Sequence, residues 1–325
     1  MNKFQTLSRK YYLPYDKVKV AEIFNELVTS RSENQRKILL DRYSPFINIL
    51  KDRFKNLVYE RNKLAQIKGF NNFFDYVADW DKVPARKLEN FLKNAVETSQ
   101  KILDNLPEKF KEPAWLTGNY NNLNFYGQVE NMKIRIPDDV FEFLIKKINV
   151  KNDVLSKIVV QETNDTLYSA EPEVYQGNVI IKYSKSGRRI EDAIGFSHEC
   201  GHAIELLSLI KKNIKPTGKP SYYHEEKAVD IELRYAKSLS RNIIKARVGN
   251  FLYTFANSLF EHEIYNNPDC DYEVAYANSR NNVCRQLNQI RNPFYVFNTF
   301  LVEYPCYSTI YSVIYNSNYK NIFVE

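Results

Sequence analysis

Apolar residues recur at helical spacing through most of the first 150 positions of the chain. One such pattern starts after Asp16, whose carboxylate can cap a helix, and a much longer one covers residues 33–68. Two further amphipathic patterns cover residues 84–106 and 140–148. The sequence therefore predicts that the first part of the chain is built from helices.

The pattern changes in the middle of the chain, where short β-branched segments alternate with turn residues. Residues 159–160, 166–168 and 179–183 predict the strands of a small antiparallel sheet. Helical spacing returns after this sheet, and only 9 glycines in 325 residues also favour helices over sheet-rich architectures. We therefore expect a mainly α fold that divides near residue 150, with an N-terminal helical lobe at 1–150 and a second lobe at 151–325.

The candidate metal-binding residues lie directly after the predicted sheet, in the segment His198-Glu199-Cys200-Gly201-His202. Residues four apart share one face of a helix, so His198 and His202 point two imidazoles at the same place. Glu199 lies about a quarter-turn away, within reach of a metal-bound water without being a ligand. A catalytic zinc ion needs this combination of protein ligands, an open position and a carboxylate that handles protons. The chain has only 4 histidines, and two of them lie in this segment.

A third zinc ligand is expected from the carboxylate-rich helical pattern at 224–233. Glu225 and Glu226 are both candidates for that position. Helix-face geometry favours Glu225, because its face is mostly apolar and carries the small Ala228, which allows close approach to the histidine-bearing helix. The face through Glu226 carries two further charges. Glu232 lies on the Glu225 face, where it could accept a hydrogen bond from a ligand imidazole.

Charge and cysteine content narrow the classes of function. The 46 Lys and Arg residues against 39 Asp and Glu residues give a net charge of +7, which is too mild and too scattered to favour nucleic acid. The 4 cysteines lack disulfide-like spacing, which indicates reduced thiols. No apolar segment opens the chain, and the apolar run at 294–315 is interrupted by Glu303 and Pro305. The sequence thus predicts a cytoplasmic protein without a secretory signal and without nucleic-acid or membrane partners.

Four stretches of the sequence resemble the M3 family of zinc metallopeptidases, the thimet oligopeptidase and oligoendopeptidase F group. They are residues 64–76, 198–202, 260–264 and 293–297, and their order along the chain agrees with the family. The resemblance implies a two-lobed helical metallopeptidase fold with a deep channel, a gluzincin site with one zinc ion (Zn2+), and substrates that are short peptides. The chain is much shorter than usual members, so the channel-forming part would be missing or reduced.

The resemblance also implies roles for individual residues. His198 and His202 correspond to zinc ligands, and Glu199 corresponds to the general base that activates a metal-bound water. Glu225 corresponds to the third ligand. Tyr295 corresponds to a substrate or oxyanion contact. Together these residues would hydrolyse peptide bonds within short peptides.

Two features of the sequence keep other interpretations open. Family members commonly carry a histidine just before the tyrosine segment, and residues 289–291 contain none. A metallocarboxypeptidase of related helical fold would need a basic group for the substrate carboxylate, and Arg280, Arg285 and Arg291 are available. A non-catalytic peptide-binding relative is a further alternative. If the chain is a peptidase, the strand at 179–183 would pair with the substrate backbone by edge addition.

Overall fold

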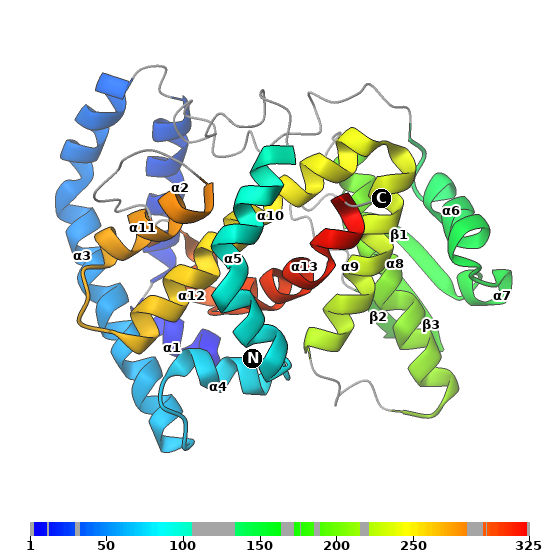
Figure 1. Ribbon diagram of the computed structural model, residues 1–325, viewed down its shortest axis with the longest axis horizontal. Helices are drawn as coiled ribbons and strands as arrows, with labels where there is room; N and C mark the ends of the chain where they lie inside the picture. Colours follow the sequence, from blue (N-terminus) through cyan, green and yellow to red (C-terminus); the bar gives the residue numbers. More distant parts are fainter. Residues whose placement is uncertain are drawn as a thin grey trace. The chain divides into compact units, whose positions relative to one another are not determined.

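The computed structural model describes residues 3–11, 13–29, 33–105, 134–163, 172–175, 177–184, 189–214, 221–284, 295–296 and 298–323. These residues form a mainly α-helical fold with one small sheet, as the sequence predicts (Figure 1). Several sequence predictions lie outside the described residues, namely the strand at 166–168, the positions 289–291 and the side chain of Arg285.

The chain packs as two compact units. Unit 1 combines Met1–Leu123 with Val248–Glu325, and unit 2 is Asn124–Arg247. This division differs from the expected boundary near residue 150. The reason is that the C-terminal helices pack with the N-terminal ones, whereas the helices just before the sheet pack with the histidine-bearing helix. Local patterning of apolar residues does not report such long-range pairing.

Unit 1 is helical throughout its described part. Its elements are α1 (Lys3–Tyr11), α2 (Pro14–Thr29), α3 (Glu33–Ile67), α4 (Phe73–Trp80), α5 (Ala85–Asn105), most of α10 (Arg241–Asn266), α11 (Tyr272–Cys284), α12 (Thr299–Glu303) and α13 (Tyr307–Phe323). Helices α3 and α5 correspond to the patterns predicted at 33–68 and 84–106. Aromatic and aliphatic side chains share the core of this unit, where Tyr295 packs against Phe54 and Phe260 with ring centroids 5.3 and 5.5 Å away.

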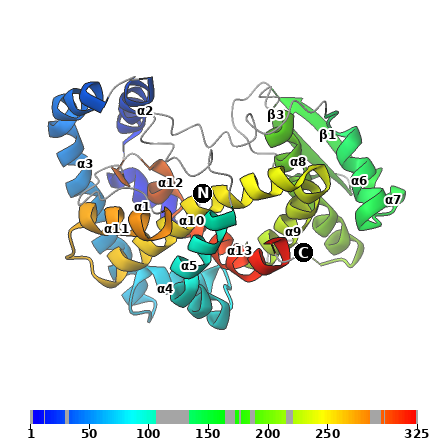
Figure 2. The same ribbon diagram turned by 45° about the horizontal axis from the view of Figure 1, so that its top comes forward.

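Unit 2 contains the sheet and the histidine-bearing helix. Its elements are α6 (Asp138–Ile148), α7 (Asn152–Leu155), β1 (Ile158–Thr163), β2 (Pro172–Tyr175), β3 (Asn178–Ser184), α8 (Arg189–Lys211), α9 (Ser221–Leu239) and the first residues of α10. Helices α8 and α9 lie side by side, and α8 also packs against β2 and β3 (Figure 2). The predicted histidine-bearing helix is therefore placed between a sheet and a second helix.

The sheet is mixed, so the prediction of an antiparallel sheet is wrong for one of its two pairings. The strand order is β1-β3-β2, in which β2 and β3 pair antiparallel and β1 and β3 pair parallel. Gly177, with φ +80°, lies in the tight connection that lets β2 and β3 pair as neighbours. Once β2 occupies one edge of β3, β1 joins the other edge in the same direction as β3. β-Branched residues predict strands, but they do not determine which edge a strand joins.

Strand β3 is the central strand, which corrects the expected role of residues 179–183. Residues 179–181 already pair with β1 on one side and with β2 on the other. Val179 and Ile181 are also fully buried. A substrate backbone therefore cannot add to β3 along these residues.

Among the residues that the structure describes, no helix combines enough length with enough apolar character to cross a membrane.

Candidate metal centre

A close contact between α8 and α9 positions the candidate site. A Cβ atom placed on Gly201 of α8 would lie only 2.6 Å from the Cα atom of Ala228 of α9. Such an approach of two helix backbones is possible because position 201 is glycine and position 228 is small. Glu225 precedes Ala228 by about one helical turn, so this contact brings Glu225 beside the two histidines of α8.

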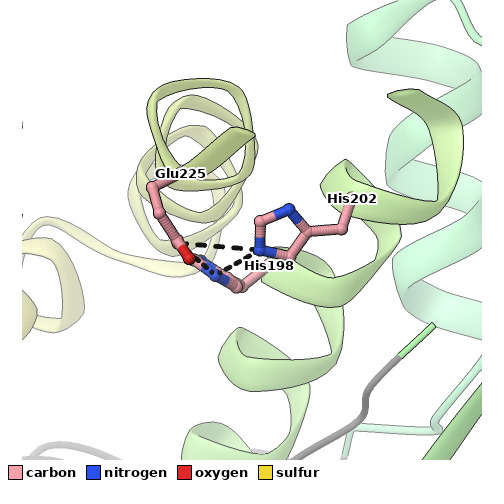
Figure 3. A group of neighbouring side chains, drawn as sticks. All are labelled: His198, His202 and Glu225. Atoms are coloured by element: carbon pink, nitrogen blue, oxygen red, sulfur yellow. Dashed lines mark hydrogen bonds and ion pairs between the residues drawn. The ribbon is translucent and has the colours of Figure 1, made fainter. Parts of the chain in front are cut away.

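Figure 3 shows that His198, His202 and Glu225 point toward one another from the two helices. The Nε2 atoms of the two histidines are 3.1 Å apart. Glu225 Oε2 lies 3.2 Å from His198 Nε2 and 3.6 Å from His202 Nε2. Zinc bonds of about 2.0–2.1 Å in a tetrahedral site would place any two ligand atoms about 3.3 Å apart. The three atoms therefore have the spacing of three corners of a tetrahedral zinc site.

The same three residues stand out from the rest of the chain. Among the described residues, they form the one group of His, Cys, Asp and Glu side chains whose geometry could hold a metal ion. Their side chains are 10, 15 and 10 % exposed for His198, His202 and Glu225, so the group is shielded but reachable from solvent. Two imidazoles and one carboxylate are a donor set that suits zinc.

The electrostatics keep Glu225 ionised. Burial by itself would raise the pKa of Glu225, but hydrogen bonds to His198 and His202 hold that pKa far below its usual value. Burial likewise would lower the pKa of His198, but Glu225 and Glu232 outweigh it and raise that pKa to about 10. A metal ion would bind the neutral imidazole, so zinc uptake would release a proton from His198 and would weaken as the pH falls.

Glu232 contacts His198 at Nδ1, the ring nitrogen that does not face Glu225. It is fully buried, and its Oε2 atom accepts a hydrogen bond from Nδ1 of His198 at 2.8 Å. In the neutral imidazole that a metal ion would bind, this bond would keep the remaining proton on Nδ1 and leave Nε2, which faces Glu225 and His202, as the ligand atom. Burial would raise the pKa of Glu232, but the neighbouring Arg247 and His198 lower it to about 2. Glu232 is thus hydrogen-bonded to His198, and its role behind a metal ligand stays a prediction.

Arg247 is a residue of this site that sequence reasoning missed. Its Nε atom donates a hydrogen bond to Oε1 of Glu232. The two residues are 15 positions apart and lie on different helices, α9 and α10. No motif or helical spacing relates them, so the sequence contains no signal that would have identified Arg247.

The other predicted site residues are not part of the three-residue group. Glu199 follows His198 on α8 and is half-buried. Tyr295 belongs to unit 1, where it is 2 % exposed in the aromatic core, and burial raises its pKa. These surroundings favour packing, and its contact with substrate stays a prediction. Arg280 is buried in the same unit, where its guanidinium donates hydrogen bonds to Asn257 and Tyr276.

The chain resembles solved peptidase structures in its fold. No protein-family model matches the sequence, and no curated protein matches it either. Among solved structures, the chain is similar to PZ peptidase A with an inhibitor, with a TM-score of 0.58 and 16 % identity over 98 % of this chain and 67 % of that chain. It is also similar to a structure described as an oligoendopeptidase F, with a TM-score of 0.55 and 14 % identity over 94 % of this chain and 66 % of that chain. The chain therefore shares the fold of these two peptidase structures.

This shared fold confirms the helical peptidase fold that the resemblance implies. It extends over nearly the whole of this chain, although the chain spans only about two thirds of the length of either solved structure. The shared fold thus accounts for the helical architecture.

The choice between the two adjacent glutamates can be tested directly. Glu226 accepts a hydrogen bond from the hydroxyl of Tyr222 at 3.0 Å and is not part of the three-residue group. Loss of an outer partner of a metal ligand typically weakens metal binding by about 10–100-fold. Glu225 would itself be a ligand, so we expect Glu225→Gln to weaken zinc binding by more than about 100-fold. The matched Glu226→Gln change is expected to leave zinc binding within about twofold of the wild type. Competition with a chromophoric chelator measures both, and equal losses would contradict the assignment of Glu225.

Proposed function

We propose that the protein is a zinc metallopeptidase that hydrolyses peptide bonds in short peptides. The observation that carries the proposal is the convergence of His198, His202 and Glu225 at the spacing of a tetrahedral zinc site. The fold supports the choice of substrate, because it is shared with PZ peptidase A and with a structure described as an oligoendopeptidase F.

The residues of the chain divide the chemistry between them. Bound zinc would supply a Lewis acid and would lower the pKa of a bound water to about 7. His198, His202 and Glu225 would hold the ion, and Glu232 would keep His198 in the binding tautomer. Glu199 would accept the proton of the attacking water and return it to the leaving amine, a role that typically contributes about 10²–10⁴-fold in rate.

The substrate backbone would add to an edge of the sheet other than β3. Strand β2 is an edge strand of the described sheet, and it also packs against α8, the helix of the two histidines. An extended peptide that pairs with β2 would donate and accept main-chain hydrogen bonds without regard to its sequence. This arrangement fits a peptidase that accepts many short peptides.

Metal analysis combined with a peptide assay tests the proposed function. We expect the purified wild type to contain one zinc ion per chain and His202→Ala to contain almost none after dialysis, because two ligands hold zinc far less tightly than three. Wild type, but not the variant, should cleave a blocked fluorogenic peptide at an internal bond. Stepwise loss of residues from the carboxyl end would instead support a carboxypeptidase. A protein that contains zinc but cleaves no peptide would support the peptide-binding alternative.

A further inference from the structure

The carboxylate of Glu232 has two different partners, one on each oxygen. Oε2 accepts from Nδ1 of His198 at 2.8 Å, and Oε1 accepts from Nε of Arg247. The Glu232 side chain is 0 % exposed, whereas that of Arg247 is 26 % exposed. A buried carboxylate is costly unless a cation or hydrogen-bond donors compensate its charge. Arg247 brings a permanent positive charge into contact with this carboxylate.

The geometry of arginine makes this contact directional. The guanidinium is planar and its donors have fixed directions, so a carboxylate bound to it has a restricted orientation. With Oε1 held by Arg247, the other oxygen of Glu232 is directed at the imidazole of His198. Arg247 belongs to the first part of α10, which lies in unit 2. The contacts therefore join three helices: α10 through Arg247, α9 through Glu232 and α8 through His198.

We propose that Arg247 is a positioning residue of the metal centre. It holds the carboxylate of Glu232 in the orientation that fixes the tautomer and the ring angle of His198, and so it sets the affinity of the site for zinc. The proposal rests on the proposed function, because it requires His198 to be a zinc ligand. It adds a residue that is hydrogen-bonded to Glu232 and is not one of the three residues of the metal-binding group.

The loss of Arg247 has a defined consequence. Glu232 would stay buried without the positive charge of the Arg247 guanidinium. Its Oε1 atom would lose the hydrogen bond that restrains rotation of the carboxylate. Outer partners of a metal-ligating histidine typically contribute about 10–100-fold in metal affinity. We therefore expect Arg247→Gln to weaken zinc binding by about 10–100-fold.

The experiment compares three proteins that differ from the wild type at one arginine of α10. Arg247→Gln removes the charge, Arg247→Lys keeps it, and Arg241→Gln makes the same change as the first at an exposed position of the same helix. Zinc affinity is measured by competition with a chromophoric chelator, and the visible absorption of the cobalt-substituted proteins reports the ligand geometry. We expect a weaker affinity and an altered cobalt spectrum for Arg247→Gln, partial recovery for Arg247→Lys, and wild-type behaviour for Arg241→Gln.

A double-mutant cycle distinguishes positioning from a general loss of stability. If Arg247 acts through Glu232, Arg247→Gln should change zinc affinity less than about twofold when it is added to Glu232→Gln. Additive effects, or wild-type affinity and cobalt spectrum for Arg247→Gln, would overturn the proposal. Circular dichroism in the presence of a chelator establishes whether each variant is folded. If Arg247→Gln is not folded, Arg247→Lys takes its place in the cycle. A wild type that binds no zinc would overturn the proposed function itself.

Discussion

Replacing Glu199 with glutamine is expected to lower kcat for peptide cleavage by about 10²–10⁴-fold while the zinc content stays at one ion per chain. Glutamine has nearly the shape of glutamate, but its amide cannot accept the proton of the attacking water. Because Glu199 is not part of the three-residue group, the metal-binding residues are unchanged. Steady-state kinetics with a fluorogenic peptide and metal analysis of the same sample measure the two effects separately.

The Glu226→Gln protein is the matched control for this prediction. It carries the same chemical change at a half-buried glutamate of the neighbouring helix, where the carboxylate is hydrogen-bonded to Tyr222. Its kcat should remain within about twofold of the wild type, as expected for a substitution away from reacting groups. If Glu199→Gln retained full activity, or lost its zinc, Glu199 would not be the general base.

The second large effect is expected at the helix contact. The methyl group of Gly201→Ala would lie 2.6 Å from the Cα atom of Ala228, which is backbone and cannot turn aside. The two helices would have to separate by about 1 Å to restore an ordinary carbon–carbon contact. We expect a loss of about 1–3 kcal/mol in the free energy of unfolding and a large loss of zinc affinity, because Glu225 would move away from the histidines.

Gly195 offers a matched control on the same helix. A Cβ atom on Gly195 meets nothing within 4 Å, so Gly195→Ala adds the same methyl group without a clash. Alanine also favours a helix over glycine by about 1 kcal/mol, so this variant should be as stable as the wild type or more so. Thermal unfolding with excess chelator separates the stability effect from the contribution of bound metal. If both variants were stable and bound zinc equally, the close contact would have no role in the site.

Residue patterns predict the local parts of this fold well. The helical spacing of apolar residues corresponds to α3, α5 and α8, and the spacing of four between His198 and His202 corresponds to two imidazoles whose Nε2 atoms lie 3.1 Å apart. The argument that small Ala228 allows close approach also agrees with the contact at Gly201. Each of these features depends on residues within a few turns of one helix, or on side-chain size at one position.

The features that the sequence did not predict depend on packing between distant segments. Nothing in the β-branched segments indicates that β1 would pair parallel to β3 rather than antiparallel, because strand propensity carries no information about the partner. Arg247 and Glu232 lie on different helices, α10 and α9, and no spacing along the chain indicates that they meet. Tyr295, whose role was inferred from a resemblance, packs in an aromatic core that its local sequence did not indicate.

All the residues of the proposed metal centre belong to unit 2, and the third ligand reaches the first two through direct contact of two helix backbones. The metal-binding site is therefore preformed, and no segment of it has to fold when an ion binds. In small zinc domains the ion organises the polypeptide, and chelators unfold them. Here the apoprotein should keep its helices, so that zinc could be removed and exchanged for cobalt without refolding the chain.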